Sequence, residues 1–321
     1  MLITGAGGFI GSHLVEEFVK AGYDVKAFVR YNSRNSWGWL EDTDVKDQIE
    51  VVAGDIRDYD SVEQALKGCE AVIHLAALIG IPYSYVSPLA YVRTNVEGTY
   101  NVLQCAMKAS VKQVIVTSTS ETYGTAQYVP IDEKHAAVGQ SPYSATKIAA
   151  DQLAISYFRS FSLPIKIVRP FNTFGPRQSA RAVIPTIVTQ ALGGSYELNL
   201  GNLHPTRDLT YVKDTVKAFL AVFESDKAVG QALNIGMNQE ISIRNLAEMI
   251  ADIMETKVTF VRSEERIRPS GSEVERLRCD NSKIIALTSW KPAYDLRSGL
   301  LETVEWIKEN QEYYKAHLYN V

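Results

Sequence analysis

The sequence of 321 residues is poor in the residues that build metal sites and disulfide frameworks. It has five histidines and three cysteines, Cys69, Cys105 and Cys279, and the cysteines have neither the spacing nor the histidine neighbours of a metal site. We therefore expect no bound metal. Unpaired cysteines are typical of the reducing cytoplasm, so we expect a cytoplasmic protein.

The sequence also lacks a long hydrophobic run and a strong charge of either sign. No apolar stretch approaches the roughly 20 residues needed to cross a bilayer, and Met1 already belongs to the first predicted strand, which argues against a signal peptide. The net charge of -4 gives no reason to propose a nucleic-acid partner. We expect a protein that binds neither membranes nor nucleic acids.

What the sequence does contain is an alternation of short apolar runs with helical patterns. The runs lie at residues 25–29, 50–53, 71–75, 114–116 and 165–168. This alternation predicts an α/β fold, a Rossmann-type doubly wound parallel sheet with buried strands. From about Thr173 the pattern changes to proline-punctuated and charged segments. We predict a dinucleotide-binding domain at 1–172 plus about 208–236, and a smaller mixed α/β substrate lobe at about 173–207 plus 237–321.

A glycine-rich loop, TGAGGFIG, follows the first apolar run. Residues 1–4 read as a strand and the residues after the loop have helical periodicity, so the loop connects strand and helix. At such a turn Gly5 can adopt backbone angles that other residues avoid, Gly8 lets the main chain approach a phosphate, and Gly11 allows close packing. The predicted site for the pyrophosphate of a dinucleotide comprises Gly5, Gly8, Phe9, Ile10 and Gly11.

A second motif, YSATK, places a phenol and an amine four residues apart. Ser141 followed by Pro142 is a good helix start, so Tyr143 and Lys147 share one helical face. A free tyrosine ionises near pH ~10, and positive charge from Lys147 and an oxidised nicotinamide would stabilise its phenolate. Tyr143 can then remove a hydroxyl proton as hydride leaves the same carbon, which predicts redox catalysis.

These motifs resemble the extended short-chain dehydrogenase/reductase superfamily, in which the glycine loop has the spacing GxxGxxG. The segments GDIRD from residue 54, HLAA from 74 and NVEGT from 95 fit the same resemblance. It implies a tightly bound NAD(H) or NADP(H) with Asp55 at the adenine. Tyr143 and Lys147 would lie at the nicotinamide. Besides Asp55, the residues implied to line the cofactor are Ile56, Leu75, Ala76, Ala77 and Asn95.

The end of the second predicted strand bears on the choice between the two cofactors. An acidic residue there normally binds the ribose diol and repels a 2'-phosphate. This sequence has Arg30 instead, and Ser33 and Arg34 offer further donors to a phosphate. The residues favour NADP(H), whereas the family relatives are NAD enzymes, so both cofactors stay open.

The segment TSTSETYG, residues 117–124, follows another predicted strand. Its polar side chains are therefore expected at the carboxyl edge of the sheet, where open α/β folds bind ligands. Thr119 is placed to hydrogen-bond the hydroxyl that is oxidised. Once carbon 4 of a sugar is a ketone, the proton on carbon 5 is acidic, and Glu121 can take it and promote loss of the carbon 6 hydroxyl as water.

Four segments, TSTSETYG, SPYSATK, RPFNTFGPR and RDLTYVKD, look like the nucleotide-sugar branch of that superfamily, with its 4,6-dehydratases, 4-epimerases and glucuronate decarboxylases. The runs SWGWL, IPYSYVSP, YGTAQYVPIDEKH and RQSARAVIPTIVTQ look most like dehydratases that act on nucleotide-linked N-acetylglucosamine in the legionaminic acid type of pathway. The resemblance implies that Asn172 and Arg207 hold the diphosphate of the substrate. It also places three residues at the border of the nucleotide, namely Arg181, Val183 and Arg268.

We therefore predict an NAD(P)-dependent 4,6-dehydratase of UDP- or GDP-N-acetylglucosamine. Its catalytic residues would be Thr119, Ser120, Glu121, Tyr143 and Lys147. The resemblance also implies a homodimer formed through the helices near 87–109 and 141–161.

One residue departs from the dehydratase pattern. Hexose 4,6-dehydratases carry Thr, Asp and Glu in succession, and the Asp protonates the departing hydroxyl, whereas Ser120 takes its place here. A serine hydroxyl is a far weaker acid than a carboxyl group. The alternatives are an oxidoreductase that acts on an unsaturated nucleotide sugar, a 4-epimerase, a UDP-glucuronate decarboxylase and a non-catalytic NAD(P)-binding sensor.

Overall fold

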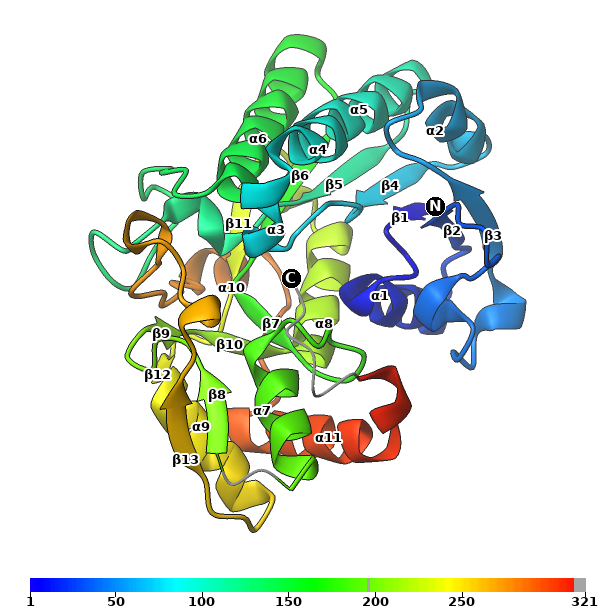
Figure 1. The fold of residues 1–321 in the computed structure, drawn as a ribbon. Coiled ribbons are helices and arrows are strands. Elements are labelled where there is room, and N and C mark those ends of the chain that lie inside the picture. The colour runs from blue at the N-terminus through cyan, green and yellow to red at the C-terminus, as the bar shows by residue number, and fades with distance from the viewer. Residues whose placement is uncertain (195–196, 315–321) are drawn as a thin grey trace.

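The centre of the protein is a parallel sheet of seven strands. The computed structural model describes residues 1–194 and 197–314. The strand order is β11-β6-β5-β4-β1-β2-β3, and every neighbouring pair runs parallel (Figure 1). The strands are β1 (Leu2–Thr4), β2 (Lys26–Arg30), β3 (Glu50–Gly54), β4 (Ala71–His74), β5 (Gln113–Thr117), β6 (Ile165–Pro170) and β11 (Ala232–Ile235). The predicted Rossmann-type sheet is confirmed.

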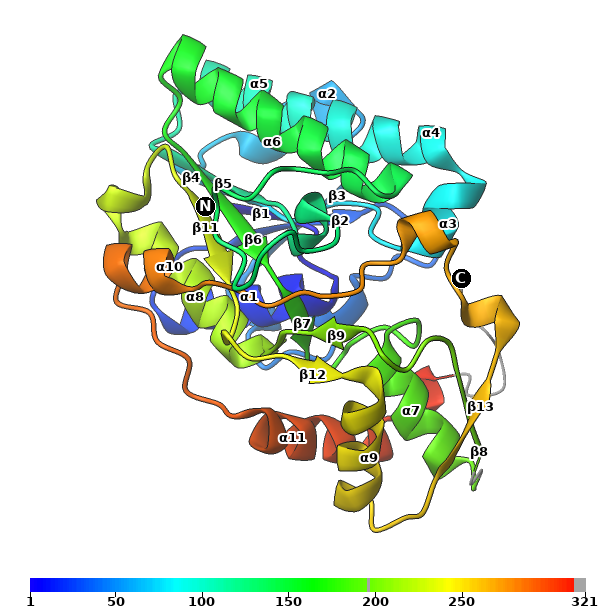
Figure 2. The ribbon, with the colours of Figure 1, turned by 90° about the vertical axis from the view of Figure 1, so that its left-hand side faces the viewer.

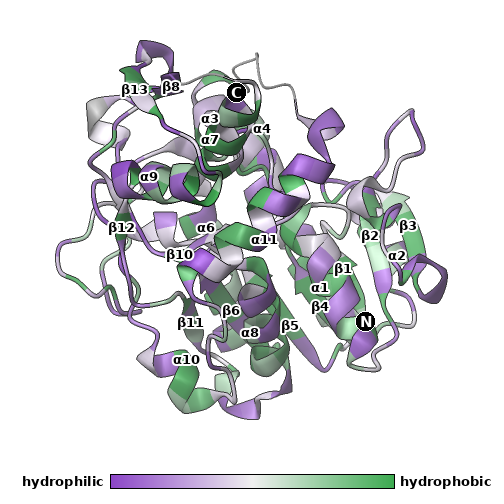
Figure 3. Ribbon diagram, turned by 90° about the horizontal axis from the view of Figure 1, so that it is seen from below, coloured by the Kyte–Doolittle hydropathy of each residue, from purple (hydrophilic) through white to green (hydrophobic). Residues whose placement is uncertain are grey.

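Helices cover both faces of this sheet. One face carries α1 (Phe9–Lys20) and α8 (Val212–Glu224), which pack on each other, and the other carries α2 (Tyr59–Leu66), α5 (Gly98–Lys108) and α6 (Pro142–Phe161) (Figures 1 and 2). Neighbouring strand residues belong to different cores: Leu2 faces the α5 side, and Ile3 faces the α1 side. Because side chains alternate along a strand, two buried faces require continuous apolar runs. Figure 3 shows the hydrophobic colour along these strands.

The remaining elements near the carboxyl edge of the sheet are short. They are α3 (Ile81–Val86), α4 (Pro88–Tyr91), the π-helical segment η3 (Val92–Glu97), and the 3₁₀ turns η1 (Gly38–Leu40), η2 (Lys46–Gln48) and η4 (Ser120–Tyr123). The segment η3 runs directly into α5.

A second group of elements lies beside the sheet (Figure 2). Its strands form three two-stranded pairs: β7 (Asn172–Phe174) with β10 (Leu209–Tyr211), β8 (Glu197–Leu200) with β13 (Thr259–Arg262), and β9 (Thr206–Arg207) with β12 (Ile241–Ser242). Its helices are α7 (Val183–Leu192), α9 (Ile243–Ile253) and α11 (Leu296–Glu309), with the 3₁₀ turns η6 (Glu264–Arg266), η7 (Ser270–Ser272) and η8 (Gln311–Tyr313). The helix α10 (Ser282–Leu287) packs on β11 and the turn η5 (Asp226–Ala228) packs on α8, so both lie at the central sheet. Residues 195–196 and 315–321 of the predicted substrate lobe lie outside the described residues.

One element differs from the sequence pattern. The helical periodicity of residues 208–223 predicts one helix, but residues 209–211 form β10, and α8 begins only at Val212. The reason is tertiary, because β10 pairs with β7 over all three residues. In the part of the chain that the structure describes, no helix is long and apolar enough to cross a membrane.

Candidate active site

The sequence-predicted residues gather at the carboxyl edge of the central sheet. The glycine loop follows β1, residues 75–77 follow β4, and residues 118–121 follow β5. These strands are neighbours, since β1 pairs with β4 and β4 pairs with β5. From β1 the chain adds β2 and β3 on one side, and it then adds β4, β5 and β6 on the other side, so the strand order changes direction between β1 and β4. Open α/β sheets bind ligands at such a point.

The glycine loop is closed on one side and open on the other. Gly5 has a φ of +71°, and a Cβ there would lie 2.8 Å from the amide nitrogen of Ala76. A Cβ on Gly11 would lie 2.1 Å from the carbonyl oxygen of Gly5. Gly8, in contrast, is exposed, and a Cβ there would approach only the Gly5 oxygen, at 3.3 Å. A Cβ at Gly8 would therefore fill space that a ligand can use.

The start of α1 offers donors to that space. Gly8 is the N-cap of α1 and has no side chain to cap the first amides, so those N–H groups point out of the helix without a side-chain acceptor. Phe9 and Ile10 form its first turn. Free amides at a helix N-terminus bind anions, so the loop fits the pyrophosphate of a dinucleotide.

The ends of β1 and β4 are held together by a buried polar cluster. The Thr4 hydroxyl oxygen lies 3.2 Å from the amides of Leu75 and Ala76, which donate to it, and 2.8 Å from Nδ1 of His74. Nε2 of His74 lies 3.1 Å from the Thr99 hydroxyl. Burial, together with the charge of Lys147, lowers the pKa of His74 to about 3. His74 is therefore a neutral residue that shapes the floor of the site.

The predicted adenosine end contains charged groups at the surface. Two guanidinium nitrogens of Arg57 donate to the Asp55 carboxylate, with Nε 3.0 Å from Oδ1 and Nη2 2.5 Å from Oδ2, and these bonds lower the pKa of Asp55. Arg30 is exposed at the end of β2, and its charge also acts on Asp55.

Three other predicted cofactor residues have different surroundings. Ile56 is buried and packs on Gly98 of α5, and Ala77 is half-buried after β4. The Asn95 amide is occupied by protein, because it accepts from the Leu78 amide at 2.8 Å and donates to the Leu78 carbonyl and the Thr146 hydroxyl. Asn95 thus joins the segment after β4 to α6 through hydrogen bonds to Leu78 and Thr146. Its contact with the cofactor stays a prediction.

The YSATK motif lies on α6 as its sequence predicts. Ser141 caps the helix and Pro142 is its first residue. Tyr143 and Lys147 are both buried, and Nζ of Lys147 donates to the carbonyl oxygen of Thr117 at 2.6 Å. Burial lowers the pKa of Lys147 to about 8 and raises the pKa of Tyr143. The amine thus comes from α6 to the end of β5, where the polar segment begins.

The segment after β5 meets the phenol. A hydrogen bond with the Thr119 side chain partly opposes the rise in the pKa of Tyr143, which places Thr119 at the phenol, and the negative charge of Glu121 adds to that rise. The Thr119 hydroxyl also accepts from the Glu121 amide at 3.2 Å and so caps η4. Ser120 is buried at the start of that turn. The structure brings together four of the predicted catalytic side chains, Thr119, Glu121, Tyr143 and Lys147.

An aromatic cluster around Tyr143 was not predicted from the sequence. The rings of Tyr91 and Tyr143 pack edge to face with centroids 6.3 Å apart, and Leu78 and Ile81 complete the cluster. The Tyr91 hydroxyl donates to the carbonyl oxygen of Gly80. These residues come from the segment after β4, and only the folded chain shows that it turns back over α6.

Among the predicted substrate residues, Arg207 and Arg268 share one carboxylate. Arg207 is buried, and its Nη1 donates to the carbonyl oxygens of Thr206 and Val274. Its Nη2 lies 3.3 Å from Oε1 of Glu273, and Nη1 of Arg268 lies 3.9 Å from the same oxygen. Burial lowers the pKa of Arg207, and the charge of Glu121 opposes this effect. Sequence reasoning missed Glu273, whose carboxylate lies near both arginines.

The other predicted substrate residues come from β7 and from the segment that leads into α7. Oδ1 of Asn172 on β7 is buried and has no hydrogen-bond partner among the described residues. Arg181 is exposed, and a Cβ on Gly80 would lie 3.3 Å from its Nη1. Val183 begins α7. The guanidinium groups suit an anionic ligand, and the buried, unpartnered oxygen of Asn172 suits a ligand that also carries a donor such as a hydroxyl.

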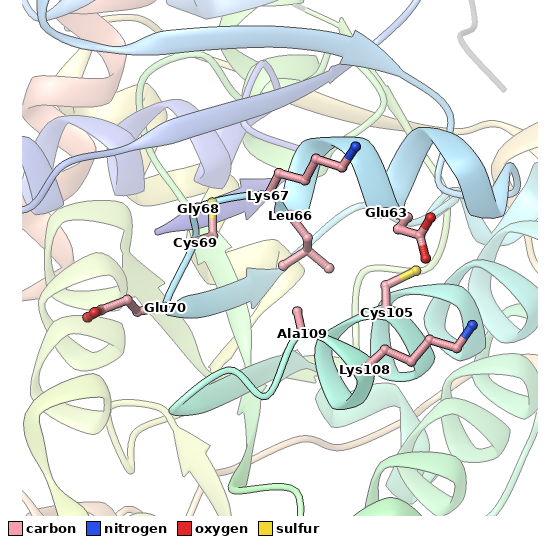
Figure 4. A pocket seen from close by; sticks show the side chains of 9 residues that line it. All are labelled: Glu63, Leu66, Lys67, Gly68, Cys69, Glu70, Cys105, Lys108 and Ala109. Carbon is pink, nitrogen blue, oxygen red and sulfur yellow. The ribbon is translucent and has the colours of Figure 1, made fainter.

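A groove at the other edge of the sheet has a different character. It lies between α2 and α5, before β4 begins, and Figure 4 shows the side chains that line it, among them Glu63, Lys67, Cys69, Cys105 and Lys108. Burial raises the pKa of both thiols, so they are protonated at neutral pH and unreactive. In residues 1–194 and 197–314 no group of three or more histidine, cysteine or acidic side chains is placed to hold a metal.

Comparisons with known proteins agree with the geometry of the carboxyl edge. The family model for GDP-mannose 4,6 dehydratase matches residues 2–303. A UDP-N-acetyl-alpha-D-glucosaminuronate decarboxylase from Bacillus cytotoxicus is 33% identical over 96% of this chain and 97% of its own length.

Two solved structures have the same fold over almost the whole chain. A dTDP-glucose 4,6-dehydratase from Streptomyces venezuelae, solved with NAD, is 29% identical with a TM-score of 0.89 and covers 98% of each chain. A UDP-N-acetylglucosamine 4-epimerase from Methanobrevibacter ruminantium is 30% identical with a TM-score of 0.85, and covers 96% of this chain and 98% of its own.

The chain belongs to the family of nucleotide-sugar dehydratases, epimerases and decarboxylases within the extended short-chain dehydrogenases/reductases. It is an enzyme of this type, which confirms the superfamily and the nucleotide-sugar branch that the sequence motifs predict.

Proposed function

We propose that this protein is an NAD(H)-dependent nucleotide-sugar 4,6-dehydratase that acts on UDP- or GDP-linked N-acetylglucosamine. The observation that carries the proposal is the position of Glu121 in η4, where its amide donates to the Thr119 hydroxyl, at the end of the strand to which Lys147 donates. A carboxylate beside a proton relay suits removal of the acidic carbon 5 proton of a 4-keto sugar. The NAD bound to the related dehydratase supports the choice of cofactor.

The glycine loop and its neighbours would hold the dinucleotide mainly through main-chain amides. The amides at the start of α1 would bind the pyrophosphate, and Asp55 and Arg30 would lie at the adenosine end. When bound, the nicotinamide would accept hydride from the sugar and return it. Arg30 stands where an acidic residue would repel a 2'-phosphate. The affinities for NAD(H) and NADP(H) should therefore be compared directly at this site.

The catalytic residues would divide the proton transfers. Tyr143, with Lys147 behind it and Thr119 beside it, removes the proton of the carbon 4 hydroxyl as that carbon is oxidised. Glu121 takes the acidified carbon 5 proton. Ser120 is too weak an acid to protonate the leaving hydroxyl, so the protonated Glu121 delivers the proton to the carbon 6 oxygen, which leaves as water.

A decarboxylase is the second candidate. The residue Ser120 favours it, because loss of carbon dioxide from a 4-keto uronic acid needs no acid to expel a hydroxyl. The Bacillus cytotoxicus relative, which is named as a decarboxylase, supports it as well.

One experiment separates these functions. The protein is incubated with NAD⁺ and, in turn, UDP-N-acetylglucosamine, GDP-N-acetylglucosamine and the corresponding uronic acids, and the products are analysed by mass spectrometry. We expect a product lighter by one water from an N-acetylglucosamine substrate, without net consumption of NAD⁺. Loss of carbon dioxide from a uronic acid would establish the decarboxylase, and an unchanged mass with altered stereochemistry would establish an epimerase.

We also infer a homodimer, and an apolar stripe on the outer side of the sheet supports it. Leu89, Val92 and Tyr100 follow one another at helical spacing along α4, η3 and α5, and their side chains are 60%, 46% and 44% exposed. Figure 2 shows these helices beside α6 on the outer layer. An exposed apolar stripe of this kind is typical of an interface. Light scattering should give a dimer for the wild type and a monomer for Tyr100→Glu, and a monomeric wild type would refute the inference.

A further inference from the structure

A third ionisable side chain continues the line of Tyr143 and Lys147 on α6. Asp151 follows Lys147 by four residues, as Lys147 follows Tyr143, so the three share one helical face. All three are buried, and the side chain of Asp151 is only 2% exposed. A carboxylate at this depth needs compensating contacts, because burial removes its hydration.

Arg169 of β6 supplies part of this compensation. Its Nε and Nη2 donate to one carboxylate oxygen, Oδ2 of Asp151, at 3.1 and 2.9 Å. Its Nη1 donates to the Tyr123 hydroxyl at 2.9 Å, and Tyr123 ends the turn η4 that also contains Glu121. Arg169 therefore ties the catalytic helix to the catalytic segment after β5.

The second oxygen of Asp151 remains to be explained. Oδ1 is buried and has no hydrogen-bond partner among the described residues. Native structures leave few buried polar atoms unpaired, and such an atom often serves a purpose other than stability. Oδ1 accepts no hydrogen bond from Arg169, because both Arg169 bonds go to Oδ2.

Besides Arg169, Asp151 acts on the charge of Lys147, one helical turn before it. Burial disfavours the ammonium form of Lys147, and the charge of Asp151 opposes that effect. The other groups around Lys147 carry no compensating negative charge: the Thr117 carbonyl from β5 accepts its hydrogen bond, His74 from β4 is neutral, and Tyr143 is a protonated phenol. Among the described residues, Asp151 is the carboxylate whose charge favours the ammonium form of Lys147.

We propose that Asp151 is a positioning residue of the catalytic site, whose carboxylate keeps Lys147 in its ammonium form so that Lys147 can stabilise the phenolate of Tyr143. Arg169 fixes that carboxylate and links it to η4. Asp151 also acts directly on Tyr143, where negative charge disfavours the phenolate. Along the helix axis the backbone of Asp151 lies about 6 Å from that of Lys147 and about 12 Å from that of Tyr143, so we expect its effect through Lys147 to be the larger.

The first experiment titrates the lysine and needs no substrate. The protein is labelled with ¹⁵N at the lysine side chains and saturated with NAD⁺, and the Lys147 resonance, assigned with Lys147→Arg, is followed by NMR against pH. In Asp151→Asn we expect the midpoint to fall by about one pH unit or more. An unchanged midpoint in a folded variant would overturn the proposal.

The second experiment rests on the proposed function and measures kcat against pH with the accepted nucleotide sugar. If the midpoint falls from about 8 to about 7, the loss of kcat in Asp151→Asn grows from about twofold near pH 7 to about eightfold near pH 8.5. A purely structural role would lower kcat by the same factor at every pH, and that result would contradict the proposal. If no nucleotide sugar is turned over, the proposed function fails, and the lysine titration still decides the role of Asp151.

Two variants control for the loss of a buried carboxylate. Asp214 is fully buried and accepts from the amides of Ala293 and Tyr294, so Asp214→Asn should lower stability without moving the Lys147 midpoint. Asp151→Glu keeps the charge and should restore a midpoint near that of the wild type. If Asp151→Asn does not fold, Asp151→Ser removes the same charge with a smaller side chain and is subject to the same two outcomes.

Discussion

The two halves of the candidate site are built in different ways. The cofactor half, which consists of the glycine loop and the segments after β4 and β5, offers main-chain amides and small side chains. The substrate half, which consists of Arg207, Arg268 and Glu273, offers long charged side chains that share contacts. A site made by the main chain needs particular residues at fixed local spacing, whereas a site made by side chains can draw them from anywhere in the chain. The first is therefore easier to recognise in a sequence.

The largest effect is expected where the two halves meet. Tyr143→Phe removes the phenol oxygen that would carry the proton, so kcat should fall by about 10²- to 10⁴-fold. Cofactor affinity, measured by quenching of protein fluorescence, should stay close to that of the wild type because the ring still packs on Tyr91. Tyr128→Phe, at an exposed tyrosine, is the matched control and should retain full activity. Retained turnover in Tyr143→Phe would show that the two halves do not share this residue.

Within the cofactor half, two glycines should separate binding from folding. A Cβ on Gly11 meets the main chain, so Gly11→Ala should lower the free energy of unfolding by about 1–3 kcal/mol. Gly8→Ala makes one close contact with the Gly5 carbonyl oxygen, much milder than the Gly11 clash, and obstructs the approach of phosphate. It should weaken NAD⁺ binding by roughly 10- to 100-fold, the value of one charge-assisted hydrogen bond. Thermal unfolding and NAD⁺ titration measure the two effects. Gly193→Ala, where a Cβ makes only an ordinary contact, is the control, and unaltered NAD⁺ affinity in Gly8→Ala would argue against the pyrophosphate site.

The substrate half should respond through KM. Arg207→Gln removes a buried charge, and with it the expected contact to the diphosphate, so KM for the nucleotide sugar should rise roughly 10-fold or more. NAD⁺ affinity should not change, because Arg207 belongs to the other half. Arg262→Gln, at an exposed arginine of β13, serves as control. A loss of NAD⁺ binding in Arg207→Gln would mean that the halves are not independent.

The smallest effect concerns the stability of the cofactor half at low pH. The folded-state pKa of His74, about 3, lies below the ordinary value of 6.5, so the unfolded chain binds the proton more readily. Stability from this residue is present above pH 6.5 and is lost as the pH falls, by about 1.4 kcal/mol between pH 7.5 and 5.5. Denaturant unfolding should show this loss in the wild type and in His204→Gln, an exposed control, but not in His74→Asn. An equal loss in His74→Asn would assign the pH dependence to other groups.

Local signals in the sequence account for much of the fold and for the cofactor half. Continuous apolar runs predict strands that are buried on both faces, as β4 and β5 are. The Ser141–Pro142 start predicts α6, and i to i+4 spacing places Tyr143 and Lys147 on one face of it. Even Asp151 lies within reach of this reasoning, since it continues the same spacing. The failure at β10 shows the limit, because helical periodicity cannot reveal a strand partner elsewhere in the chain.

The sequence by itself determined the parallel sheet, the glycine turn and the spacing of the catalytic helix, because each depends on residues close together in the chain. Only the tertiary structure decided that Arg169 joins Asp151 to the turn that contains Glu121, that Tyr91 covers Tyr143, and that Glu273 lies between two arginines. These contacts join segments far apart in the sequence, and their energies depend on burial and distance. Neither quantity exists until the chain has folded.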